Sequence, residues 1–194
     1  MFMKKFELTS ETIINNGKIL YRIKALIDFS NIKAGELGGF VEKESNLYHK
    51  GNAWVYGNAK VSGDAKVSGN ACVSGNTCIS GNARVYGNAE VYGNSRVSVN
   101  AKVYGNSRVC GNALVSGNAL VSGNADYTTI SGFGTRFRTT TFFKCSDKKI
   151  RVNCGCFYGT IDEFREQVNK TRTGKIAKEY LLIADLMEEH FKED

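Results

Sequence analysis

Small and apolar residues recur every six positions through the middle of the chain, from Gly51 to Thr128. The stretch opens with GNAWVYGNAKVSGDAKVSG, and thirteen hexads fit it without an insertion. Each hexad opens with Gly and then Asn, except that Val99 replaces one Gly and Asp64 replaces one Asn. The third residue is small, and the fifth is Val or Ile until Tyr127 ends the series. A fixed short period of this kind predicts a solenoid.

The hexad itself predicts short strands joined by tight corners. In each Ala-x-Val segment the first and third residues share one face of a strand, and the middle residue points the other way. The Gly-Asn pair accepts positive φ and makes the corner. Three strands and three corners give a triangular coil of eighteen residues with Ala and Val inside. The coils would stack at about 4.8 Å, so the hexads make roughly 20 Å of β-helix prism.

The flanking segments are predicted to cap this prism, because the terminal coils of a solenoid expose unpaired strand edges. In residues 1–50, Asn16-Gly17 lies between two β-rich runs and predicts a hairpin. We therefore expect a mainly β protein of three parts. These are an N-terminal β cap (1–50), a hexapeptide-repeat parallel β-helix (51–130) and a small α+β module (131–194).

The C-terminal segment carries its own pattern of strands and helices. Residues 139–145 and 150–154 are expected to be strands joined by the polar turn SDKK. Thr160 and Glu163 form a capping box that begins a helix reaching about residue 170. A second helix is predicted from Lys175 to Phe191, where apolar residues recur at helical spacing and indicate core packing.

Composition adds expectations about partners and location. The 194 residues carry a formal net charge of +7, and no segment is basic enough to indicate a nucleic-acid polymer as partner. No apolar run is long enough for a membrane span, and no hydrophobic signal segment follows Lys4 and Lys5. Six Cys without a secretory signal are typical of reduced thiols in a cytoplasm.

The stretch from Ile23 to Leu47, with the motifs KAGELGGFVE and ESNL followed by GNAWVYGNAKV, resembles the opening of a hexapeptide-repeat group. Members of that group occur in bacterial genomes, phages and prophages, and are often labelled acyltransferases because of the repeat. The stretches SGFGTRFRTTTFF and IRVNCGCFYGTIDEF resemble a module that ends phage-type proteins of unknown function. The resemblance implies a left-handed β-helix and a parallel homotrimer with ligands in clefts between subunits. If a phage encodes the chain, the resemblance implies that the protein is located in the cytoplasm of the host cell.

Two histidines could serve the acyltransferase chemistry that this resemblance implies, in which a His at a subunit interface acts as general base. The repeat phase places His49 at a core-facing position, with no carboxylate beside it to orient the ring. His190 has Glu neighbours, but these are ordinary on a charged terminal helix. A structural role is therefore favoured for both, and the sequence assigns no catalytic residue and no cofactor.

The outward-pointing fourth residues of the hexads sort onto three faces, because residues eighteen apart stack one coil above another. The three sets are Trp54, Cys72, Glu90, Arg108 and Asp126; Lys60, Cys78, Arg96 and Leu114; and Lys66, Arg84, Lys102 and Leu120.

The third set places Lys66, Arg84 and Lys102 in one line, which we call the basic column. Tyr86 follows two residues after Arg84, and Tyr104 two residues after Lys102. Like charges about 5 Å apart repel each other unless an anion lies opposite, and tyrosine offers a stacking face and a hydroxyl. These five residues form a candidate ligand site. The alternative is a solvated face whose long side chains spread into water.

Leu114 and Leu120 point outward at positions where the prism otherwise mostly shows charges. An exposed apolar pair near one end suggests burial against a neighbouring subunit or against the C-terminal module. We take the pair as a candidate interface of the expected homotrimer. The alternative is a monomer whose own C-terminal helix covers the two leucines.

The segment GTRFRTTT, with Arg136, Arg138 and Thr140, combines Gly, hydroxyl groups and two guanidinium groups, a composition suited to an anion such as phosphate. It lacks the spacing of a phosphate-binding loop, so a strand with polar outer residues is the alternative. Cys145 and the Cys154-Gly155-Cys156 run have no second pair and no nearby His. We therefore expect packed thiols there and no metal site.

Three functions of different classes follow. The first is a non-catalytic homotrimer that holds a small anionic, nucleotide-like ligand in its inter-subunit clefts, a role that would let a phage protein sequester a host defence signal. The second is an acyltransferase that uses acyl-coenzyme A, which needs His49 or His190 in a cleft. The third is a structural or virion-associated oligomer. The sequence favours the first, because it supplies a charged column and no catalytic group.

Overall fold

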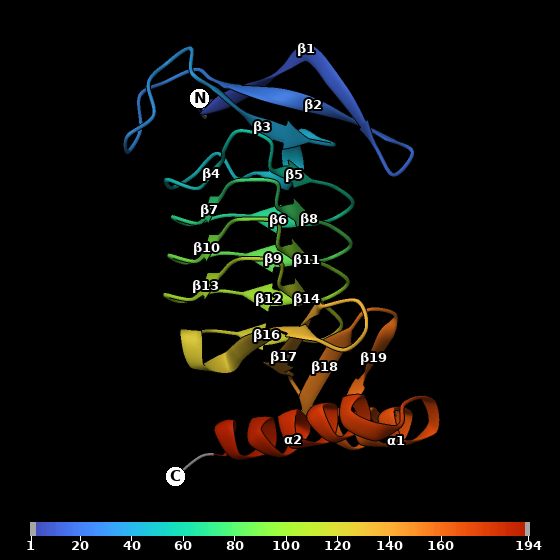
Figure 1. The fold of residues 1–194 in the computed structure, drawn as a ribbon. Helices are drawn as coiled ribbons and strands as arrows, with labels where there is room; N and C mark the ends of the chain where they lie inside the picture. Colours follow the sequence, from blue (N-terminus) through green and yellow to red (C-terminus); the bar gives the residue numbers. More distant parts are fainter. Residues whose placement is uncertain (1–2, 193–194) are drawn as a thin grey trace.

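The computed structural model describes residues 3–192 and consists of a β-solenoid prism with a β cap at one end and an α+β module at the other (Figure 1). The prism has three parallel sheets, one for each face. Their strand orders are β3-β5-β8-β11-β14, which β1 and β2 extend at the cap, then β4-β7-β10-β13 and β6-β9-β12-β15. The mainly β fold, the parallel solenoid and the helical C-terminal module that we expected are confirmed. The left hand remains an expectation from the resemblance.

Each of the first twelve hexads contributes one two-residue strand, as the pattern predicts, whereas the thirteenth forms a 3-10 turn and the start of β16 (Tyr127–Phe133). These strands are β4 (Trp54–Val55), β5 (Lys60–Val61), β6 (Lys66–Val67), β7 (Cys72–Val73), β8 (Cys78–Ile79), β9 (Arg84–Val85), β10 (Glu90–Val91), β11 (Arg96–Val97), β12 (Lys102–Val103), β13 (Arg108–Val109), β14 (Leu114–Val115) and β15 (Leu120–Val121). Every strand from β4 to β12 pairs in parallel with the strand eighteen residues further on, as Glu90 pairs with Arg108. The coil length predicted from the hexad is therefore confirmed.

The prism interior is filled by the third and fifth residues of the hexads. Val55, Val91 and Val121 have no exposed surface, and the alanines beside them are equally buried. Thr77 replaces one alanine and remains buried because its hydroxyl donates to the carbonyl of Ser74 at 2.7 Å. Burial of apolar side chains along the whole axis is the main stabilising term for such a fold.

Asparagine side chains form hydrogen-bonded ladders along the three corners of the prism. On one corner the Nδ2 group of Asn52 donates to Oδ1 of Asn70 at 3.2 Å, and Asn70 donates in turn to Asn88 at 3.0 Å. The glycines before them have positive φ, and a Cβ on Gly69 would lie 2.9 Å from the backbone of the next coil. The Gly-Asn pair is thus required both for the turn and for the close stacking of coils.

The N-terminal cap covers the first coil with a three-stranded meander. Its strands are β1 (Phe6–Asn15), β2 (Lys18–Ala25) and β3 (Leu37–Val41). Asn16 and Gly17 both have positive φ between β1 and β2, which confirms the predicted hairpin. A 3-10 turn, η1 (Glu44–Asn46), follows β3. Because β3 pairs in parallel with β5, the solenoid begins before the first hexad.

The backbone carbonyl groups of the first coil have no preceding coil to bond to, and cap side chains satisfy several of them. The buried ammonium group of Lys5 donates to the carbonyls of Gly51 at 3.2 Å and Ala53 at 2.8 Å, and it lies 4.9 Å from the centre of the Phe29 ring. Asn46 donates from its side-chain amide to two carbonyls of another corner. These bonds end the solenoid without an open strand edge.

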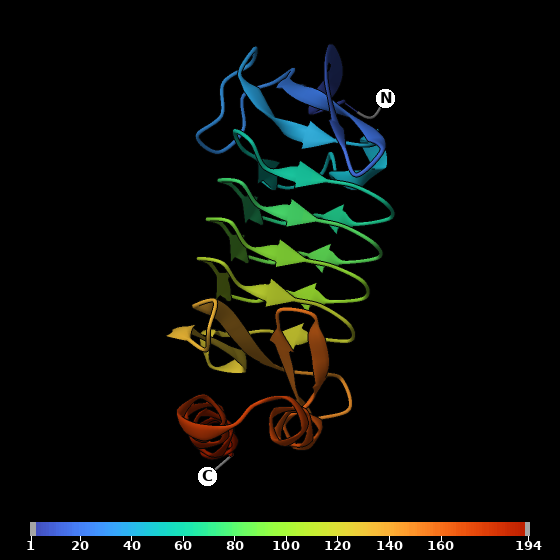
Figure 2. The ribbon, with the colours of Figure 1, turned by 45° about the vertical axis from the view of Figure 1, so that its right-hand side comes forward.

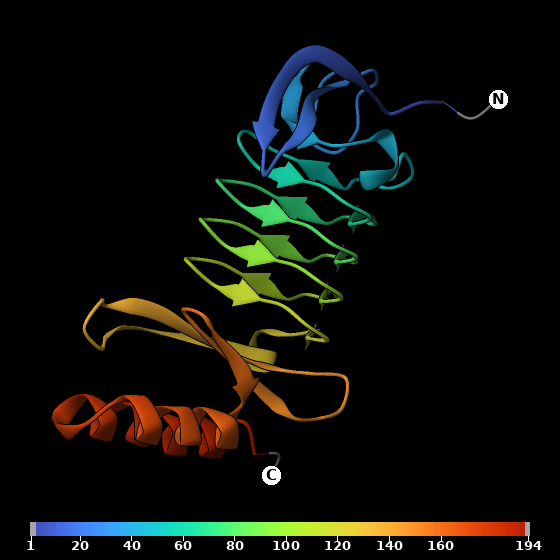
Figure 3. The same cartoon turned by 90° about the vertical axis from the view of Figure 1, so that its right-hand side faces the viewer.

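The C-terminal module is an antiparallel sheet covered by two helices. After a second 3-10 turn, η2 (Asn124–Asp126), its elements are β16 (Tyr127–Phe133), β17 (Arg138–Lys144), β18 (Ile150–Cys154), β19 (Phe157–Thr160), α1 (Ile161–Thr171) and α2 (Gly174–His190). Figure 2 shows the helices nearly end-on and side by side, and in Figure 3 the sheet lies between the last coil and the helices. The predicted strands and helices are confirmed, as is the Thr160–Glu163 capping box.

Candidate functional site

The basic column is a continuous line on the sheet formed by β6, β9, β12 and β15. Lys66 pairs with Arg84, Arg84 with Lys102, and Lys102 with Leu120 in the parallel register. The three cations are exposed and succeed one another at the strand spacing, about 4.8 Å. The structure therefore brings together the residues that the eighteen-residue period assigns to one face.

No ion pair neutralises the basic column within residues 3–192. On the other two faces the cations are either paired with a carboxylate or separated by an uncharged residue. On the first face Arg108 lies 3.1 Å from a carboxylate oxygen of Glu90 in the preceding coil. On the second face the half-buried thiol of Cys78 separates two cations. The three adjacent cations of the basic column repel each other, and a bound anion would relieve this repulsion. The third face is therefore the one that favours an anion most.

Tyrosine side chains stand beside the basic column at the sixth position of the hexads. The rings of Tyr86 and Tyr104 stack with their centroids 5.1 Å apart and their planes 6° from parallel. The same position is Ser68 in the coil before and Ser122 in the coil after. The two rings therefore form a stacked pair that has a serine in the neighbouring coil on either side.

A slot opens where Ser68 replaces a tyrosine. The cavity has a volume of 380 Å³ and is lined by Tyr48, Lys66, Ser68, Arg84 and Tyr86. It offers one aromatic side chain at each end, a hydroxyl between them and two cations beside them. This combination suits a molecule that carries both a planar ring and an anionic group.

Tyr48 is the member of this slot that the sequence reading missed. The repeat phase, run backwards from Gly51, puts His49 in the interior. In the structure Leu47 pairs with Val67 and is buried, so Tyr48 takes the same position as Ser68 one coil later. Six positions separate Leu47 from the next interior residue, Ala53, two more than the four that separate Val67 from Ala71. A buried Leu beside an exposed Tyr is the signal that could have revealed the shift.

His49 has a carboxylate partner, which corrects the expectation that no acid would orient its ring. Its Nε2 lies 2.7 Å from Oε1 of Glu44, and its Nδ1 accepts the backbone N–H of Lys5 at 3.1 Å. The ring also stacks on Phe6 with a centroid distance of 4.5 Å. Both ring nitrogens are occupied within the cap, so neither is free to accept a proton from a substrate. His190 is exposed on α2 and lies against the ring of Phe191.

Leu114 and Leu120 are half-buried in the single chain. Their strands, β14 and β15, both contact β17 of the C-terminal module. Thr141 on β17 accepts the backbone N–H of Leu114 at 2.9 Å through its hydroxyl oxygen. Part of the burial thus comes from β17, where the monomer alternative expected a helix. The trimer contact of the pair remains a prediction.

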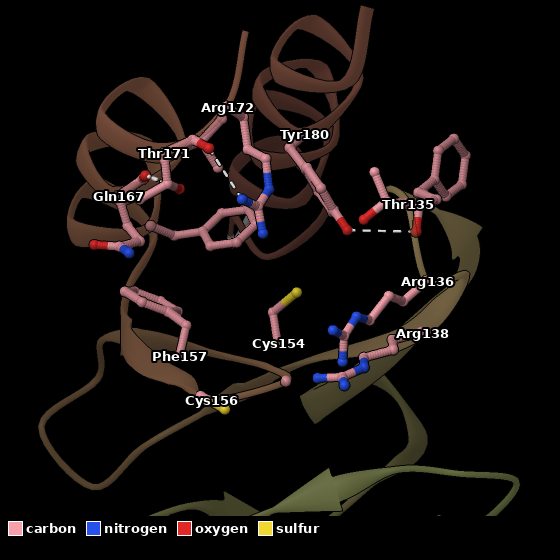
Figure 4. Close-up of a pocket in the computed structure, with 14 residues that line it drawn as sticks. Thr135, Arg136, Arg138, Cys154, Cys156, Phe157, Gln167, Thr171, Arg172 and Tyr180 are labelled. Atoms are coloured by element: carbon pink, nitrogen blue, oxygen red, sulfur yellow. Dashed lines mark hydrogen bonds between the residues drawn. The ribbon is translucent and has the colours of Figure 1, made fainter.

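The three candidate residues of the C-terminal module lie apart from the prism face. Arg136 and Arg138 line a separate cavity between the sheet and the helices (Figure 4). Thr140 is buried and does not line that cavity, and its hydroxyl donates to the sulfur of Cys154 at 3.1 Å. The structure therefore divides the predicted ligand residues between two places. Within the described chain no three metal-ligating side chains gather into a cluster.

Comparison with known proteins supports the repeat architecture. Residues 79–93, 83–99 and 107–123 match the YdcK β-solenoid repeat family. These segments lie between β8 and β15, in the regular part of the prism, and cover a minority of the chain. No curated protein matches it. Neither described helix has the length and apolar composition that crossing a membrane requires.

Proposed function

We propose that the protein is a non-catalytic binding protein that holds a small anionic, nucleotide-like molecule on the face of the basic column. The slot between Tyr48 and Tyr86, flanked by the unpaired cations Lys66 and Arg84, carries this proposal. Net charge and composition give no such indication, because other exposed cations are spread over the molecule. What distinguishes this face is that its cations adjoin one another and have tyrosines beside them.

The slot offers two kinds of contact, one for a planar ring and one for an anionic group. Tyr48 and Tyr86 occupy positions two coils apart, roughly 10 Å along the prism, so a planar ring has room between them above Ser68. Stacking of a base on an aromatic side chain contributes about 1–3 kcal/mol. A phosphate beside the ring would reach Lys66 and Arg84, and each charge-assisted hydrogen bond contributes about 1.5–3 kcal/mol. Together these terms give about 4–9 kcal/mol before the cost of association, the range of millimolar to micromolar binding.

Association into a homotrimer with parallel prism axes would place a neighbouring subunit opposite the slot and turn it into a cleft. The resemblance to hexapeptide-repeat proteins supports this part of the proposal. In a phage setting such a protein would sequester a host defence signal, a role that needs affinity and no catalytic group. The occupied ring nitrogens of His49 agree with a function that does not rest on general-base catalysis.

Calorimetry tests the proposal against nucleotides, cyclic dinucleotides, ADP-ribose derivatives and acyl-coenzyme A. We expect at least one phosphate-bearing ligand to bind, and Arg84→Glu to abolish that binding while the melting temperature stays within a few degrees. Arg96→Glu is the matched control, because Arg96 occupies the same hexad position on the second face. Equal loss in both variants would indicate unspecific charge attraction and overturn the assignment.

Two further outcomes separate the alternative functions. Transfer of the acyl group from acyl-coenzyme A to an added amine or alcohol acceptor, with release of free coenzyme A and with both lost in His49→Ala, would establish the acyltransferase instead. Absence of binding to every member of the panel at millimolar concentration would leave a structural oligomer as the better account.

A further inference from the structure

The C-terminal module contains a second cavity that the proposed function does not use. It has a volume of 330 Å³ and lies between the sheet and the two helices (Figure 4). Three chain segments that are distant in sequence enclose it. They are the turn between β16 and β17, the Gly155-Cys156 turn between β18 and β19, and the region from the end of α1 to Tyr180 on α2.

Three guanidinium groups meet at this cavity. Arg136 and Arg138 lie next to each other on one side, and Arg172 reaches in from the opposite side, with Cys154 between them (Figure 4). None of the described residues that line the cavity is Asp or Glu. No ion pair joins the three arginines to a carboxylate within residues 3–192, although Arg172 donates to the carbonyl of Thr171 at 2.9 Å. Elsewhere in the module Arg151 and Arg165 are paired with carboxylates.

The remaining wall of the cavity is aromatic. The rings of Phe157 and Phe164 are 5.4 Å apart, and Tyr180 meets Phe164 edge-on at 5.7 Å. The Tyr180 hydroxyl donates to the carbonyl of Phe133 at 3.4 Å, which fixes the ring at the cavity edge. Burial, followed by the neighbouring Cys154, raises the pKa of this hydroxyl. The wall can therefore pack against an apolar group while the guanidinium groups face an anion.

Two glycines keep the cavity open. A Cβ at Gly134 would fall 2.2 Å from the Tyr180 hydroxyl, and a Cβ at Gly155 would fall 2.8 Å from a guanidinium nitrogen of Arg138. Both glycines have positive φ, so the turns also need them. Side chains at these two turns would displace the groups that define the cavity.

We propose that this cavity, which we call the arginine cavity, is a second binding site that takes a phosphate monoester of a small aromatic or apolar group. The phosphate lies among Arg136, Arg138 and Arg172, whose planar forks match its oxygens. The apolar group lies against Phe157 and Phe164. The site stands independently of the prism face, because it shares no residue with the slot.

Calorimetry with phenyl phosphate, inorganic phosphate and phenol tests both halves of the site. We expect phenyl phosphate to bind about tenfold more tightly than inorganic phosphate, and phenol not to bind measurably. Arg138→Gln and Arg172→Gln should each weaken phenyl phosphate binding about tenfold or more. Arg96→Gln, an exposed arginine of the prism, should leave it unchanged. Because the slot also suits a ring with an anionic group, Arg84→Glu should remove any second equivalent of phenyl phosphate bound there and leave the affinity of the arginine cavity unchanged. The Arg84→Glu measurement therefore separates a failure of the arginine-cavity proposal from a failure of the proposed function on the prism face.

Cys156 supplies a local readout, because its exposed thiol lies at the cavity. Peptide mapping after alkylation compares anionic iodoacetate with neutral iodoacetamide. We expect Arg138→Gln to slow iodoacetate at Cys156 relative to iodoacetamide, and phenyl phosphate to protect Cys156 in the parent protein. The half-buried Cys78 on the prism is the internal control and should respond to neither change. The proposal is overturned if phenyl phosphate neither binds nor protects Cys156, or if Arg96→Gln weakens binding as much as Arg138→Gln.

Discussion

His49 and Glu44 are joined by a 2.7 Å contact between Nε2 and Oε1, in the cap that closes the N-terminal end of the prism. Because Nδ1 accepts the backbone N–H of Lys5, the proton of the uncharged ring lies on Nε2, and His49 donates to Glu44. The pair has the appearance of a general base with its orienting acid. Its surroundings make it a structural bridge instead, because no ring nitrogen remains for a substrate.

Replacing His49 by Ala should therefore destabilise the fold and leave ligand binding intact. The substitution removes the stack on Phe6 and leaves the Lys5 N–H without its acceptor, at a cost of about 1–3 kcal/mol. Urea denaturation measures the change. His190→Ala, on an exposed helix position, is the control and should have an effect below about 0.5 kcal/mol. A His49→Ala protein of unchanged stability would contradict the structural role.

A charge placed inside the prism should be strongly destabilising. Val91 lies at mid-solenoid and has no exposed surface, so Val91→Asp buries a carboxylate without a partner. We expect a loss of about 4 kcal/mol or more of unfolding free energy. The neighbouring Glu90→Asp change points outward and should cost far less. If both variants melt like the parent, the interior assignment is wrong.

Val99 is a strained residue whose removal should stabilise the protein. It stands where the other hexads have Gly and holds φ at 63°, a region that a β-branched side chain rarely adopts. Its side chain is 51% exposed, so little burial is lost when it is removed. After allowance for the greater flexibility of Gly in the unfolded chain, Val99→Gly should gain about 1 kcal/mol. The reverse change, Gly81→Val, should destabilise, because its Cβ would lie 2.9 Å from the Val99 backbone.

Lys5 should make stability depend on alkaline pH. Burial lowers the pKa of its ammonium group from 10.5 to about 8. Between pH 8 and 10.5 the unfolded chain therefore holds a proton on Lys5 that the folded chain has released. The contribution of Lys5 to the free energy of unfolding grows as pH rises through this window, and it is lost as pH falls through 8. We expect a gain of about 2 kcal/mol after allowance for screening by water. Subtracting the same pH series for Lys5→Met isolates this contribution, and a difference that stays flat from pH 8 to 10.5 would contradict it.

The oligomeric state decides whether the slot becomes a cleft. We expect light scattering at micromolar concentration to give the mass of a trimer, and Leu120→Glu to weaken that trimer by placing a charge at the proposed contact. A monomer mass would remove the inter-subunit part of the proposed function. The slot and the arginine cavity would both survive that result, since each is complete within one chain.

The six-residue period was enough to predict the prism. A period of six fixes which residues face inward, and eighteen residues per coil fix which outward residues share a face. The line of Lys66, Arg84 and Lys102 could thus be predicted before any coordinates. The Asn16-Gly17 turn and the Thr160 capping box were equally readable, because each depends on neighbouring residues alone. Because the repeat is regular, a single hexad indicates how strands eighteen residues apart pair with each other. This is why the arrangement of the prism could be predicted.

The contacts formed where the repetition stops could not be predicted from the sequence. Tyr48 joins the slot because the first coil is longer by two residues, a shift that the regular hexads cannot report. Glu44 meets His49 through the folding of the cap. Arg172 and Tyr180 join Arg138 because two helices pack on a sheet whose outer strands the sequence did not reveal. These contacts depend on how separate elements dock, and that docking is set by packing between surfaces that no single stretch of sequence contains.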